Sequence, residues 1–199
     1  MDETGDRRPS DPIGVRFLEC DAGWIWFRID ALLPAEQSLS ATHLDDPFPR
    51  MLDWLEEICD GAPLAMWAFS QEGISARLIF AQVNRDLLDG GSDRLILVDD
   101  GPEYEHIAMA KVERSALVRE VYYAFQAFLR DGYRADQWEY GLPPQLSYED
   151  LTDEEEAYYQ SNGLLSWNGH ALPRLCSSKI ESFLREAQAE QLSLDLRHR

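Results

Sequence analysis

The side chains best suited to acid–base, nucleophilic or metal chemistry are widely separated in this chain. They are four histidines and three cysteines: His43, His106, His170, His198, Cys20, Cys59 and Cys176. His170 follows Trp-Asn-Gly in a turn, where a catalytic base would be accessible, but no nucleophile or orienting acid accompanies it at a fixed spacing. A structural turn is the favoured interpretation, and a Cys176–His170 pair formed in space stays open. No two cysteines form a C-x-x-C pair, so their spacing favours neither a zinc site nor a disulfide framework.

The acidic residues include one candidate metal loop, DLLDGGSD at residues 86–93. Its acids lack the alternating ligand positions and the closing Glu of a calcium loop. His43, close to Asp45 and Asp46, is a second candidate group, but its position in a polar strand favours a surface role. Phosphate-loop, dinucleotide-binding, nucleophile-elbow and zinc-helix motifs are absent from the sequence. We therefore expect no metal ion and no cofactor, and a non-catalytic protein is favoured over an enzyme.

The net charge of −19, from 37 acidic and 18 basic residues, limits the classes of partner. Nucleic-acid phosphates and anionic membranes would repel such a chain, so we expect neither as a partner. The charge has three explanations: a solubilising surface, a surface that meets a basic protein, or adaptation to salt.

The polar start MDETGDRRPSDP lacks a secretory signal, and no apolar run approaches the roughly 20 residues that span a bilayer. We expect a cytoplasmic protein.

The stretch WIWFRI at residues 24–29 supplies the first candidate binding residues. Because successive side chains of a strand point to opposite faces, Trp24, Trp26 and Arg28 share one face. Either both faces of this strand are covered, which we favour, or the two tryptophans are exposed to a partner or ligand. In a ligand-binding protein the two tryptophans and Trp138 would form the apolar walls of a pocket, and Arg28 would hold an anion.

Residues 136–156 form the second candidate site, because they include eight acidic residues and no Lys or Arg. They also include several aromatic rings, which a solvated linker rarely has. This mixture suits docking to a basic protein, since buried rings supply contact area and carboxylates accelerate encounter. The alternative is that the rings pin the segment to the core and the acids only keep it soluble. The candidate binding residues here are Trp138, Glu139, Tyr140, Glu154, Glu155 and Glu156.

Helical periodicity is clearest at residues 115–131, where apolar side chains recur every three or four positions. We expect Ser115 to cap this helix and Gly132 to end it in a left-handed conformation. A second apolar stripe predicts a helix at residues 47–60. A third helix is expected at about residues 178–191, beginning with a capping box formed by Ser178 and Glu181. Alternating, turn-bounded segments predict strands at residues 15–19, 24–29, 37–44, 64–70, 74–82, 94–98 and 105–112.

Short connections between these strands favour antiparallel neighbours and an α+β fold. We expect a meander-type antiparallel β-sheet of about seven strands, with the two main helices on one face. The predicted organisation is a disordered tail at 1–12, an α+β core domain at 13–132, and an acidic aromatic segment with a C-terminal helix at 133–199 that packs on the core.

Two functional classes fit these features. The first is a non-catalytic protein-binding module, similar in composition to toxin-neutralising immunity proteins or acidic regulators, with another protein of basic character as partner. The second is an enzyme or small-ligand-binding protein with an aromatic pocket between the sheet and the C-terminal segment. A flat acidic face with exposed aromatic rings would favour the first class, and a concave aromatic pocket containing an acid or His with a strongly shifted pKa would favour the second. We favour the protein-binding module.

Overall fold

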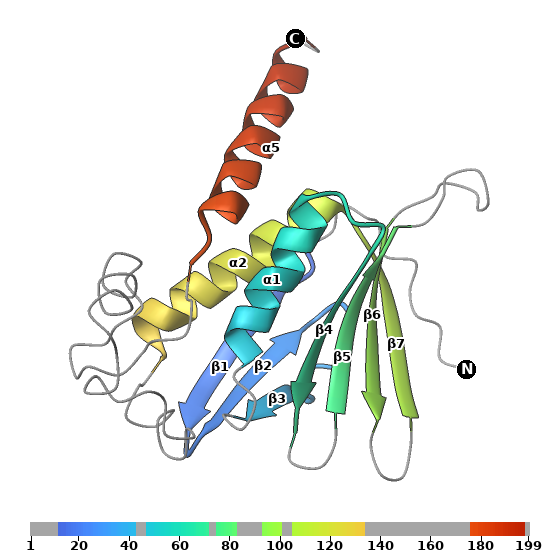
Figure 1. Ribbon diagram of the computed structural model, residues 1–199, viewed down its shortest axis with the longest axis vertical. Helices are drawn as coiled ribbons and strands as arrows, with labels where there is room; N and C mark the ends of the chain where they lie inside the picture. Colours follow the sequence, from blue (N-terminus) through green and yellow to red (C-terminus); the bar gives the residue numbers. More distant parts are fainter. Residues whose placement is uncertain are drawn as a thin grey trace, which may run out of the picture.

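The computed structural model describes residues 12–42, 47–71, 75–82, 93–100, 105–133 and 176–197. Within these ranges, two strand meanders are each followed by a helix, and a further helix lies near the C-terminus (Figure 1). The elements are β1 (Val15–Asp21), β2 (Trp24–Ile29), β3 (Leu39–Thr42), α1 (Pro47–Cys59), β4 (Leu64–Ser70), β5 (Ser75–Ala81), β6 (Asp93–Asp100), β7 (Glu105–Val112), α2 (Arg114–Asp131) and α5 (Ser178–Arg197). The predicted α+β class is confirmed.

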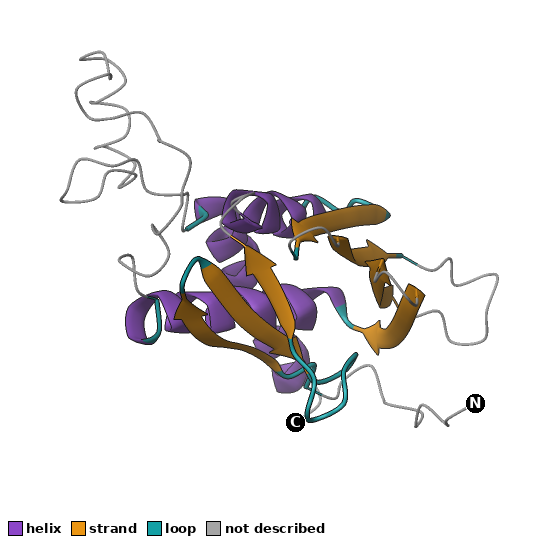
Figure 2. Cartoon of the chain, turned by 90° about the horizontal axis from the view of Figure 1, so that it is seen from below, coloured by secondary structure: helices purple, strands orange, loops and turns teal. Residues whose placement is uncertain are grey.

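The strands form two antiparallel sheets, so the prediction of one seven-stranded sheet is wrong. One sheet has the order β1-β2-β3 and the other the order β4-β5-β6-β7. The two groups of strands are seen separately in Figure 2. All the ladders join strands that follow each other directly, whereas α1 intervenes between β3 and β4. Strand β3 lies beside β4, but no hairpin sets a register between them, and β3 has four residues where eight were expected.

The first hairpin shows why the β1–β2 strands form where the sequence predicts them. Ala22 and Gly23 both have positive φ angles, 48° and 79°, the combination that a two-residue hairpin turn requires. The register shifts between Phe17 and Glu19, so Leu18 lies at a bulge and is 51% exposed. Strand β2 alternates between buried and half-buried residues as its period-2 pattern predicts.

Aromatic rings join both sheets and both main helices into one core. The Phe27 ring of β2 lies 5.5 Å from Phe17 of β1 and 5.4 Å from Trp67 of β4, between ring centroids. Trp67 in turn lies 6.0 Å from Trp54 of α1. Phe17 also contacts Phe125 of α2 at 5.6 Å. Helices α1 and α2 contact each other and lie side by side in Figure 1, so their apolar stripes cover the buried faces of both sheets.

The ends of α2 differ from the prediction in their atomic detail. Glu113, not Ser115, is the N-cap, and its carboxylate accepts hydrogen bonds from the backbone amides of Ser115 and Ala116. A carboxylate at this position satisfies free amides and also complements the helix dipole. Gly132 has a φ of −126° and is not left-handed. Glycine suits this position because a Cβ there would lie 2.9 Å from the Phe128 ring.

Helix α5 is longer than predicted and begins differently. It extends to Arg197, and the Ser177 hydroxyl oxygen accepts a 3.2 Å hydrogen bond from the Ile180 amide. Ser177 is therefore the capping residue in place of Ser178. Glu181 does not reach back to the start of the helix but accepts a hydrogen bond from the Tyr122 hydroxyl of α2.

Replacing Phe125 by alanine tests whether the aromatic core holds the fold together. The Phe125 side chain has no exposed surface and contacts rings from β1 and α1. We expect the free energy of unfolding in urea to fall by about 3–5 kcal/mol. Tyr123→Ala, two positions away on the exposed side of α2, should cost less than about 1 kcal/mol. Equal effects of the two substitutions would contradict this description of the core.

Candidate functional site

Trp24 and Trp26 lie where the sequence predicts, on the outward side of β2 opposite Ile25 and Phe27. Both tryptophans are half-buried. Their rings stack on each other with centroids 6.1 Å apart and an interplanar angle of 21°. Neither tryptophan is among the residues that line the groove between α2 and α5 described below.

Arg28 shares this outward side but is engaged by groups of its own chain. Its Nε lies 2.5 Å from Oδ1 of Asp30, and its guanidinium also donates to the carbonyl oxygen of Ala35. The second carboxylate oxygen of Asp30 binds Arg16 at 2.7 Å. An arginine held by a carboxylate and a carbonyl is poorly placed to bind an external anion, which reduces the support for the predicted anion site at Arg28.

The other predicted site residues lie outside the described part of the chain. These are Trp138, Glu139, Tyr140, Glu154, Glu155 and Glu156, together with His43, His170 and His198. The His106 backbone pairs with Asp99 in the β6–β7 ladder. The predicted docking role of residues 136–156 and the pocket that includes Trp138 therefore stay predictions, as does the division of the chain at residues 12 and 132.

The three cysteines occupy different environments. Cys20 is buried and Cys176 is exposed. Burial, with the neighbouring Asp60 carboxylate, raises the pKa of the Cys59 thiol to about 12, so Cys59 is protonated and a weak nucleophile at neutral pH.

In the described ranges, no three His, Cys, Asp or Glu side chains gather in a way that could hold a metal ion. None of the helices there combines the length and apolarity of a membrane span.

Polar side chains attach the start of α5 to the body, and the sequence did not predict this junction. The Tyr122 hydroxyl donates to Glu181 and accepts from the Ser177 amide, both at 3.2 Å. The Ser177 hydroxyl donates to Glu56 of α1 at 2.5 Å. Burial raises the pKa of Tyr122 to about 12; the hydrogen bond from Ser177 opposes this shift and Glu181 adds to it. We call Tyr122, Ser177, Glu181 and Glu56 the α5 junction.

The outward side of the four-stranded sheet has a continuous line of apolar side chains. Met66 of β4 pairs with Ile79 of β5, Ile79 with Ile96 of β6, and Ile96 with Met109 of β7. We call these four residues the outer row. Met66 and Met109 are 54% and 56% exposed, and Leu64, the next outward residue of β4, is 63% exposed. An antiparallel sheet whose outward side meets only water is usually polar there, so an apolar line on this face is unusual.

Basic residues flank the outer row. Arg94 and Lys111 lie in the cross-strand line on one side of it and Arg77 in the line on the other. Each of the three has an interaction partner within the chain. The three cations beside the outer row are therefore already engaged within the chain.

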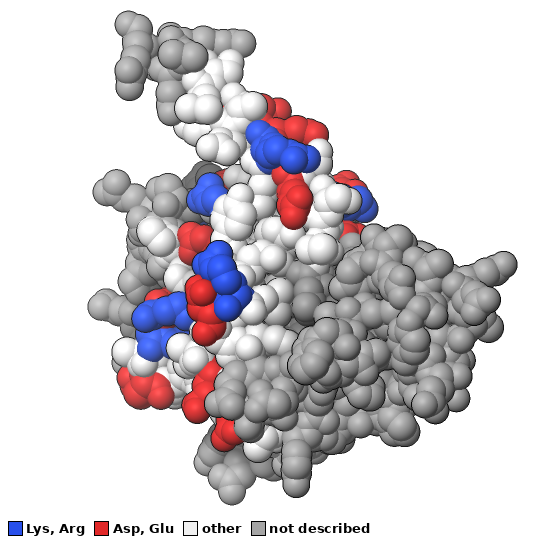
Figure 3. Space-filling model, turned by 90° about the vertical axis from the view of Figure 1, so that its left-hand side faces the viewer, with Lys and Arg blue, Asp and Glu red and all other residues white. Residues whose placement is uncertain are grey.

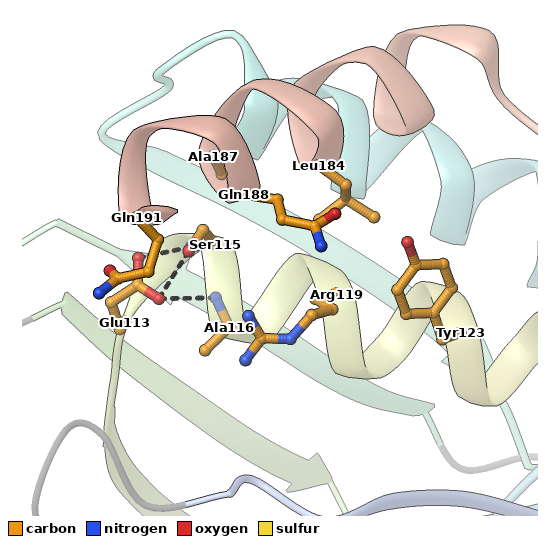
Figure 4. A pocket seen from close by; sticks show the side chains of 9 residues that line it. All are labelled: Glu113, Ser115, Ala116, Arg119, Tyr123, Leu184, Ala187, Gln188 and Gln191. Atoms are coloured by element: carbon orange, nitrogen blue, oxygen red, sulfur yellow. Dashed lines mark hydrogen bonds between the residues drawn. The ribbon is translucent and has the colours of Figure 1, made fainter. Parts of the chain in front are cut away.

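A groove of about 780 Å³ separates the first half of α2 from the middle of α5 (Figure 4). The side chains along α2 run from Ser115 to Tyr123, and those along α5 run from Gln191 to Leu184, so the helices are antiparallel there. Ser115, Ala116 and Ala187 are small, which keeps the groove open. On the face of the molecule in Figure 3, the described basic and acidic side chains lie beside one another.

Sequence reasoning missed the outer row although the signal was present. The strands at 64–70 and 105–112 were placed with the correct bounds, and their alternate positions are apolar on both faces. Reading the second face of each strand would have predicted an apolar outward side. The α2–α5 groove gave no such signal, because it depends on where α5 docks, far away in the sequence.

Comparisons of the chain with protein-family models, curated proteins and solved structures found no match.

Replacing Tyr122 by phenylalanine tests the α5 junction. The substitution keeps the ring but leaves the buried Ser177 amide without its acceptor, so we expect the free energy of unfolding to fall by about 1–3 kcal/mol. Tyr123→Phe removes an exposed hydroxyl from the same helix and should change the stability by less than about 0.5 kcal/mol. Chemical denaturation at neutral pH measures both.

The same pair of proteins gives a pH test. Because folding raises the pKa of Tyr122 from its ordinary 10.0 to about 12, the stability that the neutral phenol contributes is complete below pH 10. It is lost as the pH rises through about 12. Other groups titrate in both proteins, so the difference in stability between the parent and Tyr122→Phe should shrink between pH 10 and 12. A constant difference would show that Tyr122 is not held neutral by folding.

Proposed function

We propose that this chain is a non-catalytic protein-binding module that docks its partner on the outward side of strands β4–β7. The observation that carries the proposal is the outer row, with Met66 and Met109 each more than half exposed on one sheet face. Methionine side chains are flexible and polarisable, which suits them to contact surfaces. A rigid aromatic core behind the sheet holds the row in place.

The dimensions of the sheet fit the centre of a protein–protein interface. Four strands spaced about 4.8 Å apart, with several outward positions each, give a face of roughly 400 Å². A standard interface buries about 800 Å² on each partner and has an apolar centre within a polar rim. The outer row would form that apolar centre.

The charge of the chain favours a basic partner. At −19, the protein attracts positively charged proteins over distances beyond direct contact. Long-range attraction raises the rate of encounter, whereas the apolar row supplies the buried area that keeps the complex together. The eight carboxylates of residues 136–156 would strengthen the attraction. The alternative of a small-ligand pocket built around Arg28 has less support because Asp30 and Ala35 already bind that guanidinium.

Changing Met66 and Met109 to lysine tests the docking surface. Both side chains are exposed, so the double variant should fold with the stability of the parent. The immobilised parent is expected to capture a basic protein from a lysate of its own cell, and the purified complex should have a Kd at least about 10-fold lower than that of the double variant. Calorimetric titration measures both values.

Leu18→Lys is the matched control for this experiment, because Leu18 is 51% exposed on the other sheet and lies away from the outer row. Like the double variant, Leu18→Lys replaces an exposed apolar side chain with lysine. The control protein should still bind the partner. If no captured protein distinguishes the double variant from the parent and the control, the proposed docking surface is wrong.

Neutralising the acidic stretch tests how the partner is attracted. Changing Glu154, Glu155 and Glu156 to glutamine removes three negative charges without changing side-chain size. We expect association to become several-fold slower at low salt and its salt dependence to weaken, with no change in thermal stability. Stopped-flow measurements at two ionic strengths give the rates. Association at the parent's rate at low salt would assign this stretch a role in packing and solubility only.

A further inference from the structure

Strand β7 ends the four-stranded sheet, so one edge of its backbone faces away from β6. The order β4-β5-β6-β7 makes it the last strand on that side, and Figure 1 shows it as the outermost strand at the right. Alternate backbone groups of an antiparallel strand point to opposite edges. Among the described strands, none but β6 pairs with β7. The outer edge of β7 is therefore a template on which a further strand could pair.

The β7 edge lacks the features that usually protect a sheet edge against pairing. Protected edge strands are short, bulged or interrupted by proline. Strand β7 has eight residues without proline or glycine, and its register with β6 runs from Asp93↔Val112 to Asp100↔Glu105 without a shift. The other edges differ, because β1 has a bulge at Leu18 and contacts α2, and β4 lies beside β3. Of the described edge strands, β7 is thus the one best suited to pair with another chain.

We propose that two copies of the chain form a two-fold symmetric dimer in which their β7 strands pair antiparallel. The two four-stranded sheets would then join into one sheet of eight strands. The two-fold axis is perpendicular to the sheet and passes beside Ala108, so that Ala108 of one copy lies opposite Ala108 of the other. The pairing uses the β7 edge of both copies, so the assembly closes at two. This inference does not depend on the partner proposed for the outer row.

The sequence of β7 favours a second copy in this register. Residues opposite each other in a sheet lie on the same side of it, so paired positions must differ by an even number. With the axis at Ala108, Glu105 of one copy lies opposite Lys111 of the other. Ile107 lies opposite Met109 in the same way, and symmetry forms each pair twice. An axis at position 109 would put Ile107 opposite Lys111, and an axis at position 107 would pair five residues of β7 in place of seven.

The pairing also covers an exposed methionine. Met109 stands at the β7 end of the outer row and is 56% exposed in the single chain. In the dimer, positions 107 and 109 of both copies meet around the axis on the outward side of the sheet, where apolar cross-strand pairs stabilise the ladder. The pair of Glu105 and Lys111 contributes less, because Lys111 also interacts within its own chain. The backbone edge and this apolar cluster therefore carry the association.

The first test is the mass of the full-length protein in solution, measured by sedimentation equilibrium across a range of concentrations. We expect a concentration-dependent shift from 22.8 kDa towards twice that value. Because each chain has a charge of −19, added salt should strengthen the dimer by screening the net repulsion. Met109→Lys should weaken the dimer about 10-fold, since it puts lysines into the apolar cluster at the axis. Leu18→Lys, on the other sheet, is the control and should leave the dimer unchanged.

A cysteine at the axis tests the register. Cys176→Ser first removes the exposed native thiol. In that background, Ala108→Cys would place two thiols directly opposite each other, with Cα atoms about 4.5–5.5 Å apart, which is within reach of a disulfide. Mild oxidation by oxygen and copper–phenanthroline should then link the two copies.

Lys111→Cys in the same background is the matched control. Position 111 is exposed on the same strand, but the register separates its two copies by about 20 Å along the sheet. This variant should form the linked dimer at least about 10-fold more slowly than Ala108→Cys. Hydrogen exchange of the unsubstituted protein gives a further readout, because alternate amides of β7 should gain protection as the concentration rises.

Two results would overturn the proposal. One is a parent that stays monomeric up to about 100 µM at both low and high salt, since even a small specific interface should associate there. The other is a dimer in which Lys111→Cys links as fast as Ala108→Cys, or which Met109→Lys does not weaken. Met66→Lys alone separates this proposal from the docking surface, because Met66 lies on β4 at the opposite end of the sheet. It should reduce partner binding and leave the dimer intact.

Discussion

The fold depends on the ring of Phe27. Its contacts extend to Phe17 in its own sheet and to Trp67 and Phe69 in the other sheet, all within 5.5 Å between ring centroids. Among the described strands no hydrogen-bonded ladder joins the two sheets, so side-chain packing holds these strands together. Aromatic rings suit this task because each buries a large area and tolerates both stacked and edge-on contacts.

Helices α1 and α2 stabilise the contact between the sheets by covering it. Phe48 of α1 and Phe125 of α2 lie 4.8 Å apart, and Trp54 of α1 rests against Trp67. On the outward side of the four-stranded sheet, away from these two helices, Met66 and Met109 remain exposed. The outer row is therefore a direct consequence of a two-layer fold whose second sheet is apolar on both sides.

Much of the fold could be predicted because its signals are local. The stripe of α2 and the alternation in β2 need only neighbouring residues, and both elements form at the predicted positions. The division into two sheets could not be predicted, because it depends on whether β3 and β4 pair across α1, which no local pattern encodes. A side-chain cap at the start of α2 was predicted, but the capping residue is Glu113 and not Ser115. The side chain of Glu113 is longer, so its carboxylate reaches two backbone amides from a position outside the helix.

The candidate sites likewise include features that the local sequence predicts and features that it does not. Trp24, Trp26 and Arg28 could be assigned to one face from their spacing alone, but the pairing of Arg28 with Asp30 depends on the turn after β2. The α5 junction joins residues up to 121 positions apart, so nothing in the local sequence predicts it. Its polar contacts attach the first turn of α5 to α1 and α2.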